Sequence, residues 1–170
     1  MARIKYINLV PLLAAVIVSS AGCARPFPSS ILDRVDKSVS FADLNKDSQK
    51  YKGKWVMLAG IIVLTRTERD GSTSIEVVQK PADSEGRPLR TDETGGRFIA
   101  VSKQFLDPVV YQGGREISVV GEVVGDTVRP LGEMVYRYPL LEVEALHLWE
   151  EPSYGPGFSF GVGVGVIHGH

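Results

Sequence analysis

Residues 55–69, WVMLAGIIVLTRTER, decide the fold class of this 170-residue chain. Val, Ile and Leu dominate the run, and this composition is typical of a β-strand. It is long enough to curl around a small barrel, with Gly60 at the expected bend. The pair Asp70-Gly71 follows and predicts a hairpin turn, because glycine accepts the positive φ that such turns need. A second strand is therefore expected at 74–79.

Three further strands are expected downstream, at 97–102, 116–124 and 136–149. The segment 116–124 alternates apolar and polar side chains, as a half-buried strand does. Between the third and fourth strands, Phe105-Leu106-Asp107-Pro108 breaks the strand pattern and predicts a helical turn or compact crossover. The polar segment 81–96 is expected to be a solvent-exposed excursion.

A short polar helix is expected before the first strand. Ser40 can cap this helix, Asp43 lies in its first turn, and Phe41 and Leu44 are its inward residues. A short N-terminal helix, three strands, a helical crossover and two more strands form the order of an OB-like barrel. We therefore predict an all-β, five-stranded OB-like barrel. A different small β-barrel or a β-sandwich is the alternative.

The composition is that of one ordinary globular domain, with 44% hydrophobic and 23% charged residues. The formal net charge is -1. Proteins that bind the phosphate backbone of nucleic acids concentrate Lys and Arg, and this chain does not. No nucleic-acid partner is expected.

The N-terminal residues 1–22 have the pattern of a signal peptide. Arg3 and Lys5 precede an apolar stretch that is about half of the roughly 20 residues a transmembrane helix needs. Small residues then lead directly to Cys23, the single cysteine of the chain. A plain secretory signal, cut after Ala21 or Gly22 and leaving a free thiol, is one interpretation.

A second interpretation is a lipid anchor, because Ser20-Ala21-Gly22-Cys23 resembles the lipobox of bacterial prolipoproteins. The resemblance implies cleavage between Gly22 and Cys23 and a cysteine that carries diacylglycerol and an N-linked acyl chain. No other cofactor is expected. Several acyl chains hold a protein on a membrane essentially permanently. Ala24, where an inner-membrane lipoprotein would carry Asp, is similar to the outer-membrane sorting pattern.

The mature chain from about residue 41 to 149 resembles the Slp family of bacterial outer-membrane lipoproteins. The resemblance rests on Gly95-Gly96-Arg97-Phe98-Ile99-Ala100, Phe105-Leu106-Asp107-Pro108, Tyr111, Val119-Val120-Gly121, Gly125, Tyr136-Arg137-Tyr138-Pro139, Leu141-Glu142-Val143 and Leu148-Trp149. It implies an envelope lipoprotein whose namesake is induced on starvation or in stationary phase, and no established catalytic activity.

Four segments follow from these observations. The signal peptide, 1–22, precedes a lipidated cysteine and tether at 23–40 that lets the domain stand off the bilayer. The β-barrel domain occupies 41–151. The Gly-rich tail, 152–170, is expected to pack loosely or stay mobile. Its His168 and His170 are only two ligands for a metal ion, so no metal site is expected.

No catalytic residue is expected. Alternation places His147 on the inward side of the fifth strand without a catalytic partner, and no G-x-S-x-G motif occurs. An enzyme would need His147 exposed in a cleft beside a carboxylate of perturbed pKa.

The candidate ligand face is formed by Arg97, Tyr136 and Tyr138, because the open face of an OB-like barrel stacks on bases or sugars. Arg66, Arg69 and Arg137 are expected near it. Core packing and a mixed surface explain the same residues without a ligand. Our leading hypothesis is a non-enzymatic structural or interaction lipoprotein that faces the periplasm from the outer membrane and contacts an envelope protein or glycan. The alternative is a module that binds a glycan, peptide or small ligand.

Overall fold

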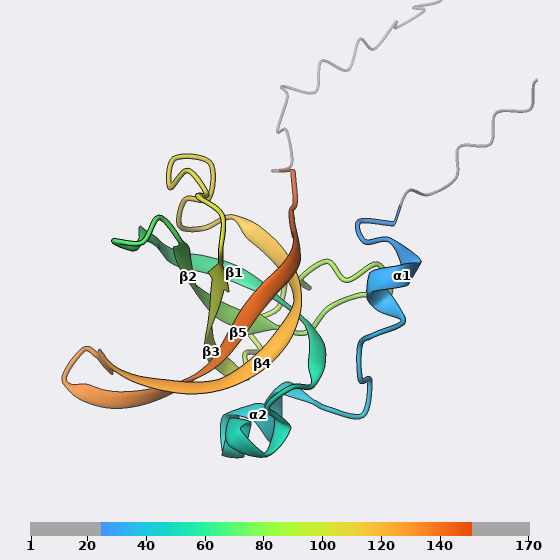
Figure 1. Ribbon diagram of the computed structural model, residues 1–170, viewed down its shortest axis with the longest axis horizontal. Coiled ribbons are helices and arrows are strands. Elements are labelled where there is room, and N and C mark those ends of the chain that lie inside the picture. The colour runs from blue at the N-terminus through green and yellow to red at the C-terminus, as the bar shows by residue number, and fades with distance from the viewer. Residues whose placement is uncertain (1–24, 151–170) are drawn as a thin grey trace, which may run out of the picture.

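The computed structural model describes residues 25–150, which form a closed barrel with short helices before it (Figure 1). The helical elements are α1 (Ser29–Leu32), α2 (Phe41–Asp47) and the 3-10 helix η2 (Ser48–Tyr51). The strands are β1 (Trp55–Thr67), β2 (Thr73–Lys80), β3 (Gly96–Ser102), β4 (Glu116–Leu131) and β5 (Met134–Leu148). Their order around the barrel is β1-β2-β3-β5-β4, with β3 and β5 parallel and the other pairs antiparallel. The predicted all-β, OB-like five-stranded barrel is confirmed.

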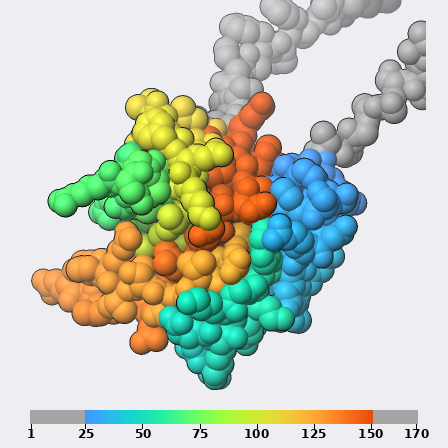
Figure 2. All heavy atoms as spheres, in the orientation of Figure 1, coloured from blue at the N-terminus to red at the C-terminus, as the bar shows by residue number. Residues whose placement is uncertain are grey.

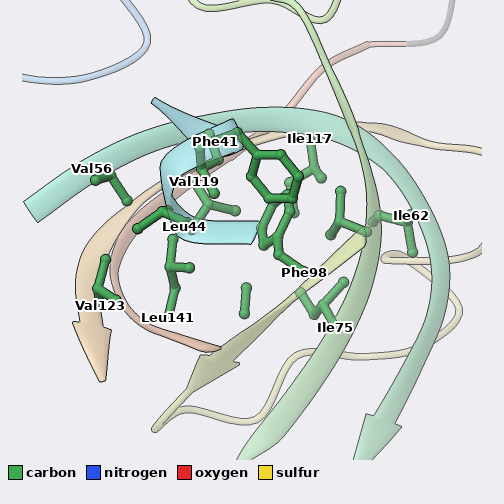
Figure 3. Packing of buried hydrophobic residues seen from close by; sticks show 13 residues of the cluster. Phe41, Leu44, Val56, Ile62, Ile75, Phe98, Ile117, Val119, Val123 and Leu141 are labelled. Atoms are coloured by element: carbon green, nitrogen blue, oxygen red, sulfur yellow. The ribbon is translucent and has the colours of Figure 1, made fainter. Parts of the chain in front are cut away.

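Apolar side chains from all five strands fill the barrel (Figure 3). The buried strand residues are Val56, Leu58, Ile62, Ile75, Val77, Phe98, Ala100, Ile117, Val119, Val123 and Leu141. Phe41 and Leu44 of α2 complete this core at one end of the barrel, where the ring of Phe41 lies 6.1 Å from that of Phe98. Burying each large apolar side chain stabilises the fold by roughly 1.5–3 kcal/mol.

The start of α2 is the one the sequence predicts. The amide of Asp43 donates to the hydroxyl oxygen of Ser40 at 3.2 Å, and the amide of Ser40 donates to the Asp43 carboxylate at 3.0 Å. This reciprocal capping box satisfies amides that the helix leaves without partners. It fixes the direction in which Phe41 and Leu44 enter the barrel.

The crossover between β3 and β4 is a single helical turn, which we call the crossover turn (residues 105–111). The amides of Val110 and Tyr111 both donate to the carbonyl of Asp107 at 3.0 Å. The carboxylate of Asp107 accepts from the amide of Val109 at 2.9 Å. Asp107 is therefore the turn-forming residue that its position before Pro108 predicts.

The β4–β5 hairpin is longer than predicted. The two strands pair from Ile117↔Leu148 out to Leu131↔Met134, beyond the predicted strand ends at 124 and 136. A shift of register between Val123 and Gly125 carries β4 onward, and Gly125 has a φ of +128° there. A bulge of this kind interrupts the alternation that marks a strand in the sequence. The hairpin extends from the barrel as an arm (Figure 1).

The polar segment 81–96 returns to the barrel for part of its length. Gly86 and Pro88 are buried, and the hydroxyl of Ser118 on β4 donates to the carbonyl of Gly86 at 2.5 Å. The guanidinium of Arg87 pairs with Glu116 at 2.7 Å. The expected fully exposed excursion is thus wrong for its middle, because these groups have partners on β4.

Within residues 25–150, no helix has both the length and the apolar character that crossing a bilayer requires.

Candidate functional site

The segment that precedes the barrel, residues 25–40, packs on its outer surface. Phe27 is 2% exposed, and its ring meets the ring of His147 edge to face with 6.4 Å between centroids. His147 in turn meets Trp149 edge to face at 4.5 Å. Figure 2 shows this segment, in blue, against the orange-red end of β5. Edge-to-face aromatic pairs add to the stabilisation that burial of their area provides.

A second attachment joins the segment to the start of β1. The amide of Asp36 donates to the carbonyl of Trp55 at 2.8 Å, and the Lys54 ammonium lies 3.0 Å from the Asp36 carboxylate. The guanidinium of Arg34 lies 3.2 Å from the centre of the Trp55 ring, a cation–π contact. A hydrogen bond from the Ser38 hydroxyl, followed by one from Lys54, lowers the pKa of Asp36 to about 2.

This packing differs from the tether that the sequence predicts over 23–40. Of that stretch, residues 25–40 are described, and α1 and the two attachments hold them on the barrel. The reason is that Phe27 and the backbone of Asp36 find partners on β5 and β1. Cys23 and the cleavage site Gly22–Cys23 lie outside the described residues, as do the signal peptide and the tail with His168 and His170.

A groove of about 560 Å³ lies between this segment and the barrel. Apolar side chains such as Phe27, Leu32 and Met57 line it together with charged ones such as Arg25 and Glu85. Its volume is within the range of pockets that hold small ligands. Sequence reasoning missed the groove, because it depends on the packing of a segment expected to be free.

His147 faces outward, and the prediction that it faces the core is wrong. The register of β4 and β5 passes from Val120↔Ala145 to Gly121↔Val143, so that Glu144 is an extra residue in β5. One extra residue moves every following side chain to the other face of the strand. Leu146 and Leu148 therefore pack against the core, and His147 is half-buried between Phe27 and Trp149.

The three residues of the candidate ligand face lie together outside the barrel core, with Arg97 and Tyr136 partly exposed and Tyr138 buried. The hydroxyl of Tyr136 accepts a hydrogen bond from the amide of Arg97 at 3.0 Å, and the rings of Tyr136 and Tyr138 are 4.7 Å apart. The Arg97 guanidinium pairs with Glu76 at 2.5 Å. The Tyr138 hydroxyl donates to the same carboxylate at 3.4 Å. We call Glu76, Arg97, Tyr136 and Tyr138 the Arg97 cluster.

The Arg97 cluster is satisfied within itself. Tyr138 is 1% exposed, and its burial, together with the negative charge of Glu76, raises the pKa of its hydroxyl. A ring this buried offers no face for stacking, and the charge of Arg97 has its counter-ion. The ligand face stays a prediction that requires Tyr138 to be uncovered. Sequence reasoning missed Glu76, although its place between Ile75 and Val77 predicts an outward carboxylate beside Arg97.

The other arginines expected near this face, Arg66, Arg69 and Arg137, make no ion pair or hydrogen bond with the Arg97 cluster that the structure describes. Arg66 and Arg69 are exposed, at the end of β1 and in the β1–β2 hairpin. Arg137 pairs with Asp126 on β4 at 3.6 Å. Among residues 25–150, no group of three or more His, Cys, Asp or Glu side chains is placed to hold a metal ion.

Residues 21–160 match the Outer membrane lipoprotein Slp family. The chain belongs to this family. It is 30% identical over 101 residues to an uncharacterized lipoprotein, YeaY, of Escherichia coli, a match that covers 59% of this chain and 51% of that protein. The chain thus spans about half the length of this relative. It is also 26% identical over 136 residues to an uncharacterized protein of Haemophilus influenzae, covering 79% of this chain and 73% of that protein.

Solved structures that resemble the Slp-family barrel include single-stranded DNA binding proteins. A mitochondrial one from S. cerevisiae is 15% identical with a TM-score of 0.35, covering 55% of this chain and 92% of that chain. A small one from Streptomyces coelicolor is 13% identical with a TM-score of 0.33, covering 55% and 92%. Likeness at this level says nothing about the ligands of this chain.

Proposed function

We propose that this Slp-family chain is a non-enzymatic lipoprotein of the outer membrane, held by lipid on Cys23. Its barrel faces the periplasm and has a structural or interaction role in the cell envelope. The family match, which begins at residue 21, supports the membrane lipoprotein role. A link to starvation or stationary phase is part of the proposal and rests on the resemblance to the family alone.

The observation that carries the proposal is the buried side chain of Phe27. Phe27 is 2% exposed and lies four residues after Cys23. Four residues span at most about 14 Å when fully extended. An acylated Cys23 would therefore hold the barrel close to the bilayer surface. This arrangement suits a protein that presents its barrel at the membrane.

The contacts of the titratable groups support a non-enzymatic role. His147, which an enzyme of this chain would need in a cleft beside a carboxylate, has its ring between Phe27 and Trp149. In the Arg97 cluster, the guanidinium and the carboxylate of Glu76 pair with each other. Contacts of this kind support a structural role for these groups, since a catalytic acid or base needs access to a substrate atom.

The intact mass of the membrane-extracted protein tests the proposal. The full chain and a Cys23→Ser variant are expressed in a Gram-negative host, and inner and outer membranes are separated. We expect a mass equal to residues 23–170 plus glycerol and three acyl chains, found in the outer-membrane fraction and lost in the variant. An unacylated soluble periplasmic product would contradict the proposal.

The groove beside residues 25–40 favours a second candidate function, the binding of a short peptide, glycan fragment or other small ligand. Its volume of about 560 Å³ and its mixture of apolar and charged side chains support this candidate. Titration with short peptides and peptidoglycan fragments, followed by the NMR signal of the Met57 methyl group, is the test. Shifts at Met57 that disappear in a Leu32→Trp variant, whose larger side chain fills the groove, would support it. Saturating additions without a shift at Met57 would contradict it.

A further inference from the structure

We propose that the crossover turn is a second membrane contact, in which Phe105, Val109 and Val110 enter the lipid interface and fix the orientation of the anchored barrel. The inference rests on the proposed lipid anchor at Cys23 and extends it. The lipid would hold the chain on the membrane, whereas the turn would decide which side of the barrel faces the bilayer.

The three side chains are unusually exposed for apolar residues. Val109 is 78% exposed, Phe105 61% and Val110 48%. Their exposure in water has a cost that insertion into lipid removes, at about 25 cal/mol for each Å² of apolar surface. Isolated exposed apolar residues are ordinary, whereas several close together mark a contact surface. The tip of the β4–β5 hairpin exposes Val128, Met134 and Val135 to similar extents. The crossover turn is therefore singled out by its position relative to the anchored end of the chain.

The turn is held rigidly in the conformation that presents this patch. The amide of Leu106 donates to the hydroxyl oxygen of Thr73 at 2.9 Å, and the hydroxyl of Thr65 donates to the carbonyl of Tyr111 at 2.6 Å. Leu106 and Tyr111 also pack against the core. Because the turn is already ordered, insertion would lose little conformational entropy.

A series of contacts connects the turn to the anchored segment. Phe27 packs on His147, and His147 packs on Trp149. The guanidinium of Arg115 donates both to the carbonyl of Trp149 at 2.9 Å and to the carbonyl of Val110 at 3.3 Å. The crossover turn and the beginning of the described chain are thus joined through the end of β5.

The position of the anchored end places the crossover-turn side of the barrel toward the lipid. Figure 1 shows the crossover turn at the upper left and the blue start of the described chain at the upper right, with α2 and the β4–β5 hairpin tip in the lower half. Figure 2 shows the yellow atoms of the crossover projecting from that upper side. Cys23 precedes Arg25 by two residues, a reach of at most about 7 Å. An acylated Cys23 therefore brings a lipid surface to this side, and lipid is the partner we assign.

Matched probes at two equally exposed valines test the inference. Val109 is 78% exposed on the crossover turn, and Val135 is 76% exposed near the tip of the β4–β5 hairpin. Each is changed to cysteine in the full acylated chain, where Cys23 has no free thiol, and labelled with a polarity-sensitive fluorophore. The proteins are reconstituted into vesicles of phosphatidylethanolamine and phosphatidylglycerol that contain a lipid-borne quencher.

We expect quenching of the label at Val109→Cys to be at least about threefold stronger than at Val135→Cys, because interfacial insertion reaches the headgroup–acyl boundary. A second measurement needs no variant. Hydrogen exchange of the acylated protein should slow at residues 105–111 on addition of vesicles and stay unchanged at residues 128–135. Intact mass of the same samples reports whether the anchor is present.

The outcomes separate this inference from the proposed function. Acylated protein whose turn is as accessible to water as the hairpin overturns the membrane contact and leaves the lipid anchor intact. Protein that carries no acyl chains overturns the proposed function and this inference together. Lipid protection at the hairpin instead of the turn reverses the orientation and also overturns the inference.

Discussion

The rings of Phe27 and His147 meet edge to face, with their centroids 6.4 Å apart. This contact joins the first described segment of the chain to the last strand of the barrel. It covers part of the outer face of β5, which alternation alone would leave to water. At this position β5 is thus covered on both faces, on the inside by the barrel core and on the outside by the segment that contains Phe27.

A Phe27→Ala substitution should destabilise the protein by about 3 kcal/mol, in the range of buried phenylalanine truncations. The reason is the loss of a ring that is 2% exposed. The matched control is Phe105→Ala, whose ring is 61% exposed, with an expected change within about 0.5 kcal/mol. Urea unfolding of the purified protein in detergent measures both. Equal midpoints for the two variants would show that residues 25–40 do not pack as described.

The pairing of Glu76 with Arg97 should contribute more than any exposed ion pair of this barrel. Their side chains are 15% and 29% exposed, so Glu76→Ala leaves a partly buried guanidinium without its counter-ion. It also removes the acceptor of the Tyr138 hydroxyl. We expect a loss of about 1–3 kcal/mol in the free energy of unfolding.

An exposed pair supplies the control for this measurement. Lys50 and Asp47 are 3.3 Å apart, with side chains 73% and 35% exposed. Asp47→Ala should cost no more than about 1 kcal/mol. A double-mutant cycle with Glu76→Ala and Arg97→Ala isolates the pair, and a coupling energy near zero would contradict its structural role.

The fold was predictable wherever the pattern is local. The capping box of Ser40 and Asp43, the alternation in β4 and the turn at Asp107 each depend on residues a few positions apart. The length of the β4–β5 hairpin and the face of β5 that carries His147 were not predictable. Bulges at Gly125 and Glu144 change the register there without a local signal in the sequence. A single extra residue reverses the faces of everything that follows it.

The candidate site shows the same limit. Arg97, Tyr136 and Tyr138 do lie together, as an OB-like barrel predicts. Their partner Glu76 lies on β2, which pairs with β3. The contact of Tyr138 with Glu76 depends on the pairing of β3 with β5, which are far apart in the sequence. The packing of residues 25–40 was also beyond the sequence, because Pro and Ser there are typical of a free linker.

Gly60→Ala should disturb the pairing of β1 with β2 and destabilise the barrel. A Cβ at Gly60 would overlap the carbonyl oxygen of Val78 on the paired strand. Because backbone cannot move aside as a flexible side chain can, we expect a loss of about 3 kcal/mol or more, at the upper end of overpacking. The control is Gly71→Ala in the β1–β2 hairpin, where nothing lies within 4 Å and only the φ of +85° opposes the change. We expect about 1 kcal/mol there, and thermal unfolding that ranks the two variants in the opposite order would contradict this account.

The attachment of residues 25–40 to β1 should weaken in acid through Asp36. Hydrogen bonds from Ser38 and then Lys54 lower the pKa of this carboxyl from 3.8 to about 2. A carboxyl with a lowered pKa in the folded state stabilises the fold above its unfolded pKa, and this contribution is lost as the pH falls toward the folded value. The contribution of Asp36 should thus be complete above about pH 4 to 5 and decline toward pH 2.

Carboxyl NMR titration measures the pKa of Asp36 directly, and hydrogen exchange of its amide, which donates to the carbonyl of Trp55, reports the attachment. Ser38→Ala removes the largest cause and should raise the Asp36 pKa toward 3.8. An Asp36 that titrates at its ordinary value in the unmodified protein would show that Ser38 and Lys54 do not hold its carboxylate, and that acid does not weaken the attachment through this group.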